Sequence, residues 1–308
     1  MRSFQGAVLF ADMLGFSALT RGNLNLGAQE CDPWKVDSNG DFPHQLLAAK
    51  ILLAFRKALT QTKKAFEGVR VAQLSDCAFL WSTDVGAIAD AGRYLMYEAA
   101  LRGLLCRGGL AFGDVHEPDK VNHSLGAFIV GDAVTRAATY ESVGKGMRVF
   151  TDPETAHRVM AVRPTESFQP LINPLTGDTF DEWRWYAPSQ STRSERTVTS
   201  LRKELERIVG CHTMLRYSPK LSWSATTSEG CRQIACSVVA VSNALEQLSG
   251  NSGAYQFSVE YLLGANHRRS DSVRKRIQQE WVNKLLGAIQ PSQRGRQTRR
   301  FSGQRASH

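Results

Sequence analysis

A short apolar run that ends in an aspartate and a glycine turn constrains this chain more than any other segment. Residues 7–10 are small or apolar and do not alternate with polar residues, which is typical of a strand covered on both faces. Asp12 follows the run, and Gly15 lets the backbone turn so that the next N–H groups point at an anion. The segment predicts a buried strand with a carboxylate at its end, where a metal-bound phosphate can lie. An aspartate that only caps a helix or forms a turn explains this segment alone equally well.

A second carboxylate lies in a hairpin. Residues 69–81 have the pattern of two short strands around a tight turn, with Asp76 at or beside the turn. A hairpin tip next to a strand end can bring Asp12 and Asp76 to one point. Two carboxylates that converge can hold a pair of divalent cations, as phosphoryl and nucleotidyl transfer require. The alternative is a plain aspartate turn.

A third segment suggests a family. Arg107, Gly109, Gly113 and Val115 fit the strand pattern R-x-G-x-x-x-G-x-V, and Gly131 opens an Ala-rich helix. In this order the three segments resemble the catalytic domain of class III nucleotidyl cyclases, over residues 5–155. The resemblance implies an α+β sandwich in which helices flank a mixed sheet with a ferredoxin-like core.

The resemblance also implies a site and a reaction. The ribose 3′-hydroxyl of a nucleoside triphosphate would attack the α-phosphorus in line, and pyrophosphate would leave. Two ions, Mn²⁺ or Mg²⁺, would assist attack and departure. By position, the metal ligands would be Asp12, Asp76 and the carbonyl of Met13, and the triphosphate would meet Gly15, Phe16 and Ser17.

Two positions depart from the purine cyclases. Ala72 stands where adenylate cyclases carry a base-reading lysine, and Phe128 where they carry an acidic residue. Guanylate cyclases have Glu and Cys there, which also differ. Because neither side chain can hydrogen-bond a base edge, we expect adenine specificity to be lost. The chain therefore resembles Pycsar-type bacterial cyclases, which make cyclic UMP or cyclic CMP in antiphage defence, and we favour UTP over CTP. A purine cyclase is the alternative.

The transition-state positions depart as well. Thr135 and Thr139 stand where the family has Asn and, four residues on, Arg. Arg136 lies about 100° around the helix from these positions and cannot simply substitute. Arg107 and Lys120 are candidates for phosphate contact, although each could be a solvated surface charge. The sequence is therefore also compatible with a slow or inactive enzyme.

The family resemblance implies a homodimer with the active site at its interface, and a downstream effector that binds the cyclic nucleotide. Two other functions remain open. One is a cyclase-like module that binds nucleotide or only dimerises. The other is a palm-type nucleotidyl transferase that acts on a chain end, because that architecture also uses paired carboxylates.

Composition indicates a cytoplasmic protein. No apolar run reaches the roughly 18 residues that span a bilayer, and we expect no signal peptide and no membrane partner. The six cysteines form no CxxC pair, which predicts free thiols in a reducing compartment. Cys77 and Cys106 fall in expected strands and are interpreted as small core residues.

The positive charge is concentrated at the end of the chain. Residues 267–308 hold eleven Lys or Arg and two acids, which is the whole surplus of nine charges. This segment can attract phosphates, but its two large aromatic residues, Trp281 and Phe301, do not alternate with the basic residues as a base-stacking surface requires. We therefore interpret it as a solvated end and expect no nucleic-acid partner.

The same patterns divide the chain. We expect a catalytic domain over residues 1–187, a linker over 188–200, a helical extension over 201–289 and a basic disordered tail over 290–308. Within the first unit, residues 21–44 are expected to form a polar loop and residues 183–186 the closing strand.

Overall fold

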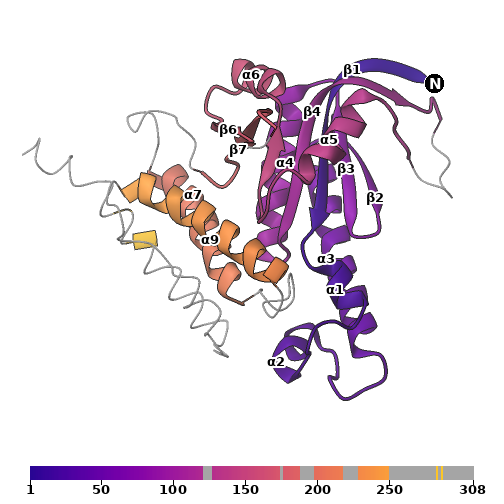
Figure 1. The fold of residues 1–308 in the computed structure, drawn as a ribbon, viewed down its shortest axis with the longest axis vertical. Helices are drawn as coiled ribbons and strands as arrows, with labels where there is room; N and C mark the ends of the chain where they lie inside the picture. Colours follow the sequence, from indigo (N-terminus) through magenta and orange to yellow (C-terminus); the bar gives the residue numbers. More distant parts are fainter. Residues whose placement is uncertain are drawn as a thin grey trace, which may run out of the picture.

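The computed structural model describes residues 1–120, 127–173, 176–187, 198–217 and 228–249, together with residues 282, 283 and 286. Its centre is one seven-stranded mixed sheet with the strand order β2-β3-β1-β4-β5-β7-β6 (Figure 1). The strands are β1 (Arg2–Met13), β2 (Arg70–Leu74), β3 (Cys77–Ser82), β4 (Cys106–Glu117), β5 (Val149–Thr151), β6 (Phe168–Ile172) and β7 (Thr179–Trp183).

Nine helical elements accompany the sheet in the described ranges. They are α1 (Phe16–Thr20), α2 (Ala28–Cys31), the 3₁₀ turn η1 (Asp32–Trp34), α3 (Pro43–Ala65), α4 (Val85–Leu101), α5 (Asp132–Glu141), α6 (Pro153–Val162), α7 (Val198–Tyr217) and α9 (Ser228–Ser249). Caps fix two of the starts. Asp84 accepts hydrogen bonds from the backbone at the start of α4, and Asp152 does so for α6.

The first four strands form the ferredoxin-like core that the sequence predicts. β1 lies between β3 and β4 and is antiparallel to both, and β2 pairs antiparallel with β3. The connections β1-α3-β2 and β3-α4-β4 are therefore split crossovers, each joining parallel strands with one strand between them. This topology places the end of β1 beside the β2–β3 turn.

Each face of the sheet buries a different set of side chains. Leu9, Leu80 and Leu110 belong to the large core with α3, α4 and α6, whereas Val8 and Trp81 belong to a smaller core with α5. This alternation along the strands is the two-residue period of β structure. The α5 side is covered less completely, because Phe10 and Phe79 on this face are only partly buried.

The segment over residues 21–44 is more structured than the polar loop that we predict. It contains α2 and η1, and it buries Leu24, Cys31 and Val36 in a small extension of the main core. The His44 ring contacts the carbonyl oxygen of Leu24 at 2.8 Å, which closes the segment onto the start of α3. Figure 1 shows this arm below α1 at one end of the molecule.

The prediction for the closing strand is wrong in its boundaries. The strand is β7, which ends at Trp183, and residues 184–187 form a turn. β6 was not predicted at all. It is an edge strand with Pro170 inside it and with an exposed Ile172, so it shows no apolar alternation.

Helix α7 packs on α4, and α9 packs on α7 (Figure 1). They begin close to the positions expected for the first two helices of the extension. Most of the expected linker, the third expected helix apart from three residues, and the basic tail lie outside the described residues. No helix in the described ranges is long and apolar enough to cross a membrane.

The five cysteines that the structure describes are free thiols, as predicted. Cys106 is buried in the core, which also agrees with the prediction. Cys77 differs, because it is only partly buried and faces the region around Asp12. The reason is that Cys77 pairs with Asp12 across β1 and β3, on the less covered face of the sheet.

Candidate active site

Asp12 and Asp76 lie side by side at one end of the sheet. The N–H of Met13 donates to the carbonyl oxygen of Asp76 over 3.1 Å, so the backbone of the β2–β3 turn is bonded to the end of β1. Both carboxylates are partly buried. The topology therefore brings together two residues that are 64 positions apart in the sequence.

Strand register places the neighbours of Asp12 on the same face. Cys77 and Arg107 are its direct partners on β3 and β4. Two residues further along the strands, Phe10 and Phe79 are partners, and their ring centroids are 4.8 Å apart. The face thus presents a charged row at its end and an aromatic row beside it.

The electrostatics around Asp12 favour a cation. Burial is the main reason that the pKa of Asp12 rises to about 7, and the charges of Glu141 and Asp76 add to the rise. The Arg107 guanidinium opposes it. The Asp12 carboxylate is thus partly desolvated and is repelled by the charges of two other carboxylates, and a divalent cation bound to Asp12 and Asp76 would offset this repulsion.

Glu141 is the residue that the sequence reasoning missed. It ends α5, is buried, forms an ion pair with Arg107 and a hydrogen bond with Asp12. Burial raises its pKa as well. A glutamate on the expected inner stripe of an Ala-rich helix was the available signal, because charges on such a stripe are rare unless they are paired.

The residues fit a hard cation such as Mg²⁺ or Mn²⁺. Carboxylate and carbonyl oxygens are the donors that these ions prefer, and Asp12, Asp76 and Met13 supply them. Cys77 does not compete as a thiolate, because burial and the nearby carboxylates raise its pKa to about 11. Within the described ranges, no group of three or more His, Cys, Asp or Glu side chains has the geometry of a metal site. The candidate centre therefore rests on two carboxylates and backbone oxygens.

The predicted triphosphate-binding residues lie directly beyond Asp12 in the chain. Gly15 has φ +81°, a left-handed conformation that favours glycine, and it starts α1. In α1, the side chain of Phe16 is buried, whereas that of Ser17 is exposed. Gly15 to Ser17 are therefore adjacent to Asp12 along the chain, and Ser17 is open to a ligand.

Ala72 borders the aromatic row, whereas Phe128 lies two residues before Val130, which bridges to His116 near the other end of β4. Ala72 pairs with Phe79 across β2 and β3 and packs against the smaller core. Phe128 lies between two residues that pack against that same core, and its own side chain is 54% exposed. Neither side chain has a hydrogen-bonding group, so neither position offers a polar contact to a base.

Thr135 and Thr139 are exposed on the outer side of α5. The Thr139 hydroxyl donates to the carbonyl of Thr135 over 2.9 Å, and the Thr135 hydroxyl donates to the carbonyl of Gly131 over 3.3 Å. Arg136 lies on another face of the helix, where its guanidinium contacts Asp132, Asp152 and the carbonyl of Phe112. The structure therefore places the two threonines on the side of α5 that faces away from Asp12.

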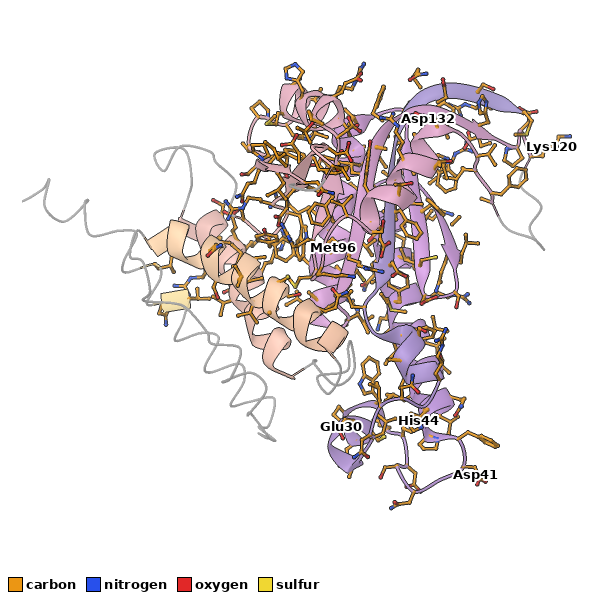
Figure 2. The ribbon with its side chains drawn as sticks, viewed as in Figure 1. Glu30, Asp41, His44, Met96, Lys120 and Asp132 are labelled. Atoms are coloured by element: carbon orange, nitrogen blue, oxygen red, sulfur yellow. The ribbon has the colours of Figure 1, made fainter. Side chains whose placement is uncertain are left out.

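Arg107 and Lys120 have very different positions. Arg107 is 3.6 Å from Asp12 and is already paired with Glu141. Lys120 follows Asp119, which pairs with the amino terminus at the other end of β1 (Figure 2). At about 3.3 Å per residue, this end of β1 is roughly 30 Å from Asp12, so Lys120 does not belong to the same cluster.

No family model matches the sequence, and no curated protein matches it. Among solved structures, the guanylyl cyclase Cya2 is similar at 14% identity and a TM-score of 0.42, over 59% of this chain and 91% of that one. The adenylyl cyclase CyaB from P. aeruginosa matches at 15% identity and a TM-score of 0.42, over 64% of this chain and 100% of that one. A bacterial light-regulated adenylyl cyclase matches at 17% identity and a TM-score of 0.40, over 66% of this chain and 100% of that one. With identities and TM-scores this low, the likeness carries no conclusion about the family or activity of this chain.

Proposed function

We propose that this protein is a nucleotidyl cyclase that converts UTP or CTP into the 3′,5′-cyclic monophosphate and pyrophosphate. The observation that carries the proposal is the convergence of Asp12 and Asp76 at the end of β1, with Glu141 raising the local negative charge. This is a cation site placed directly before a glycine turn and an exposed serine. We infer a catalytic unit over residues 1–187 and a helical extension over 201–289.

In the proposed reaction, the 3′-oxygen bonds to the α-phosphorus, and the bond between the α-phosphorus and the oxygen that bridges to the β-phosphate breaks. Pyrophosphate leaves with that oxygen, and the hydroxyl proton passes to water. Two bound Mn²⁺ or Mg²⁺ ions would supply charge neutralisation at the attacking and leaving oxygens. Asp12, Asp76 and the Met13 carbonyl would hold these ions. Gly15, Phe16 and the Ser17 hydroxyl would orient the triphosphate, so that positioning lowers the barrier.

The apolar base region supports pyrimidine specificity. Ala72 and Phe128 offer no donor or acceptor to a purine edge, and Phe10 and Phe79 offer rings against which a base can stack. A site without polar base readers selects by size and shape, for which a methylene-sized difference is worth about 10- to 200-fold. The bulk of Phe128 favours the smaller pyrimidine ring. UTP is favoured over CTP only by the resemblance to Pycsar-type cyclases, which also suggests a role in antiphage defence and an effector that binds the product.

The exposed threonines support a homodimer with shared sites. Thr135 and Thr139 point away from Asp12 of their own chain, and exposed apolar side chains flank α5 at Phe128, Val130 and Val143. A second copy on this side would bring the threonines toward the partner's metal carboxylates. Each threonine could then donate a hydrogen bond to the α-phosphate, without the charge that an arginine supplies.

A second candidate function follows from the same threonines. Both hydroxyls are bonded to their own helix, and Arg136 is held by two aspartates, so no free cation of α5 is available for the transition state among the described residues. A nucleotide-binding or dimerisation module without turnover would have this arrangement. The Asp12 and Asp76 pair favours the enzyme.

The test is incubation of the purified protein with each of the four nucleoside triphosphates and Mn²⁺, followed by mass spectrometry of the products. We expect cyclic UMP or cyclic CMP, and we expect Asp76→Ala to reduce the yield by at least about 100-fold. Asp178→Ala is the matched control, because it removes an exposed carboxylate between β6 and β7 at the other edge of the sheet, and its yield should stay unchanged. Nucleotide binding without any cyclic product would support the module instead.

A further inference from the structure

The turn between α5 and β5, residues 142–148, is held by side chains of the distant helix α9. The Gly146 N–H donates to the Oε1 of Gln233 over 2.5 Å, and the Met147 N–H donates to the Oγ of Ser237 over 2.9 Å. Ser237 is fully buried, and Gln233 is 6% exposed. Two main-chain donors of the turn therefore depend on α9 for their acceptors.

The contact is too close for any residue but glycine. Gly146 has φ +85°, and a Cβ atom there would lie 2.8 Å from the Ser237 nitrogen and 2.9 Å from the Cys236 Cβ. From the opposite direction, the indole N–H of Trp185 donates to the Met147 carbonyl over 3.1 Å. The turn is thus held by hydrogen bonds with two partners, which are helix α9 and the side chain of Trp185.

The same turn joins two parts of the candidate site. It starts after Glu141, the last residue of α5. It ends at Arg148, whose carbonyl accepts the Gly108 N–H over 3.0 Å. Arg107 precedes Gly108, and its guanidinium contacts both Asp12 and Glu141. The positions of Arg107 and Glu141 relative to Asp12 therefore depend on where the turn lies.

We propose that Gln233 and Ser237 are positioning residues, through which α9 sets the geometry of the metal carboxylates. They touch neither substrate nor metal and act through Gly146, Met147 and the β4–β5 contact. The inference rests on the proposed function, because it assumes that Asp12 binds a divalent cation. It also gives the helical extension a part in the site, although α9 contributes no group to the chemistry.

A purely structural role would give a different result. The loss of a hydrogen bond to a buried N–H lowers stability wherever it occurs. A positioning role also changes the affinity of Asp12 and Asp76 for a cation in the folded protein. The measurement is therefore Mn²⁺ binding, followed as the loss of the free-ion signal in electron paramagnetic resonance, at a temperature where every variant is folded.

The variants are Ser237→Ala, Gln233→Ala and Gln233→Glu, with Val241→Ala as the matched control. Val241 is fully buried one turn further along α9 and has no hydrogen-bonding side chain. We expect Ser237→Ala and Gln233→Ala to raise the Kd for Mn²⁺ by about 2- to 30-fold. Gln233→Glu keeps an oxygen acceptor for the Gly146 N–H and should restore the affinity. Val241→Ala should lower stability and leave the Kd unchanged.

Amide hydrogen exchange gives a second readout that needs no metal. We expect faster exchange of the Gly108 N–H in Ser237→Ala than in Val241→Ala. If Mn²⁺ binds the unmodified protein and Ser237→Ala equally well, the positioning role is wrong and the proposed function stands. If Mn²⁺ does not bind the unmodified protein at all, both the metal site and the positioning role are wrong.

Discussion

At the scale of single residues, the account depends on the surroundings of Asp12. A carboxylate that is partly buried among other carboxylates lowers the stability of the folded protein. Such an arrangement is typical of sites where a bound ligand restores that stability. The sequence predicts Asp12 and Asp76 because each follows a strand pattern. It does not predict Glu141, because the contact with Arg107 and Asp12 forms only when α5 packs across β1 and β4.

Removal of the Asp12 charge should stabilise the metal-free protein at high pH. The pKa of Asp12 is raised to about 7, so the folded state holds a proton that the unfolded state loses above its pKa of 3.8. Stability therefore falls as pH rises from about 4 to 7, and Asp12→Asn avoids the loss. We expect this variant to gain about 2–4 kcal/mol at pH 8 in EDTA, at about 1.4 kcal/mol per unit of pKa shift.

Urea unfolding at pH 8 and pH 5 measures this effect. The gain should shrink toward pH 5, because Asp12 is then already protonated in the unmodified protein. Asp114→Asn, on the exposed part of β4, is the control and should change little at either pH. Equal stability of Asp12→Asn and the unmodified protein at pH 8 would contradict the account of this site.

Ser75 is strained next to Asp76. Its φ of +59° is in the left-handed region, which costs a non-glycine residue about 1–2 kcal/mol. Ser75→Gly removes this cost and loses about 0.5–1 kcal/mol through the greater freedom of the unfolded chain. We expect a net gain of up to about 1 kcal/mol in thermal unfolding, and a loss of stability would argue against the turn geometry.

At the scale of elements, the packing of α5 on β4 sets the site. Long, periodic elements were predictable from the sequence, because α3, α4 and β4 carry strong apolar patterns. The arm over residues 21–44 was not, because Leu24, Cys31 and Val36 are separated by polar residues and meet only in three dimensions. β6 gave no pattern because it is an edge strand with no fully buried side chain, in which the half-buried Phe168 and Leu171 lie on opposite faces.

A methyl group at Gly109 should push α5 away from the sheet. A Cβ atom there would lie 2.0 Å from the Ala137 carbonyl oxygen and 2.8 Å from the Glu141 nitrogen. Overpacking of this kind costs about 1–3 kcal/mol or more, and Glu141 would move away from Arg107. Differential scanning calorimetry of Gly109→Ala should show the loss. Gly68→Ala, where nothing lies within 4 Å, should be nearly neutral, and equal effects of the two substitutions would contradict this packing.

At the scale of the whole molecule, the account requires two copies. Within one chain, Thr135 and Thr139 are separated from Asp12. The proposed reason is a site shared between two copies, and the sequence suggests this only through the family resemblance. The base positions likewise carry no polar group, because Ala72 and Phe128 cannot hydrogen-bond a base. The size and shape of the base pocket depend on how the second copy covers this face of the sheet. No pattern in the sequence of one chain predicts that arrangement.

A charge on the α5 side should weaken the dimer. Val130 is 51% exposed beside the start of α5, and Val130→Asp would bury a carboxylate in the proposed contact. We expect sedimentation velocity to show a dimer at least about tenfold weaker, equivalent to about 1.4 kcal/mol. Ile172→Asp, on the β6 edge, is the control and should not change the dimer. A monomeric unmodified protein that makes cyclic nucleotide would contradict the shared site.

The measurement that tests the central claim most directly is a competition among substrates. Equal concentrations of UTP, CTP, ATP and GTP are incubated together with the protein and Mn²⁺, and the cyclic products are quantified by mass spectrometry. Their ratios report relative kcat/KM values, which measure discrimination in the transition state. The account predicts cyclic UMP or cyclic CMP in at least about tenfold excess over cyclic AMP and cyclic GMP. A product mixture in which a purine cyclic nucleotide equals or exceeds the pyrimidine products would contradict it.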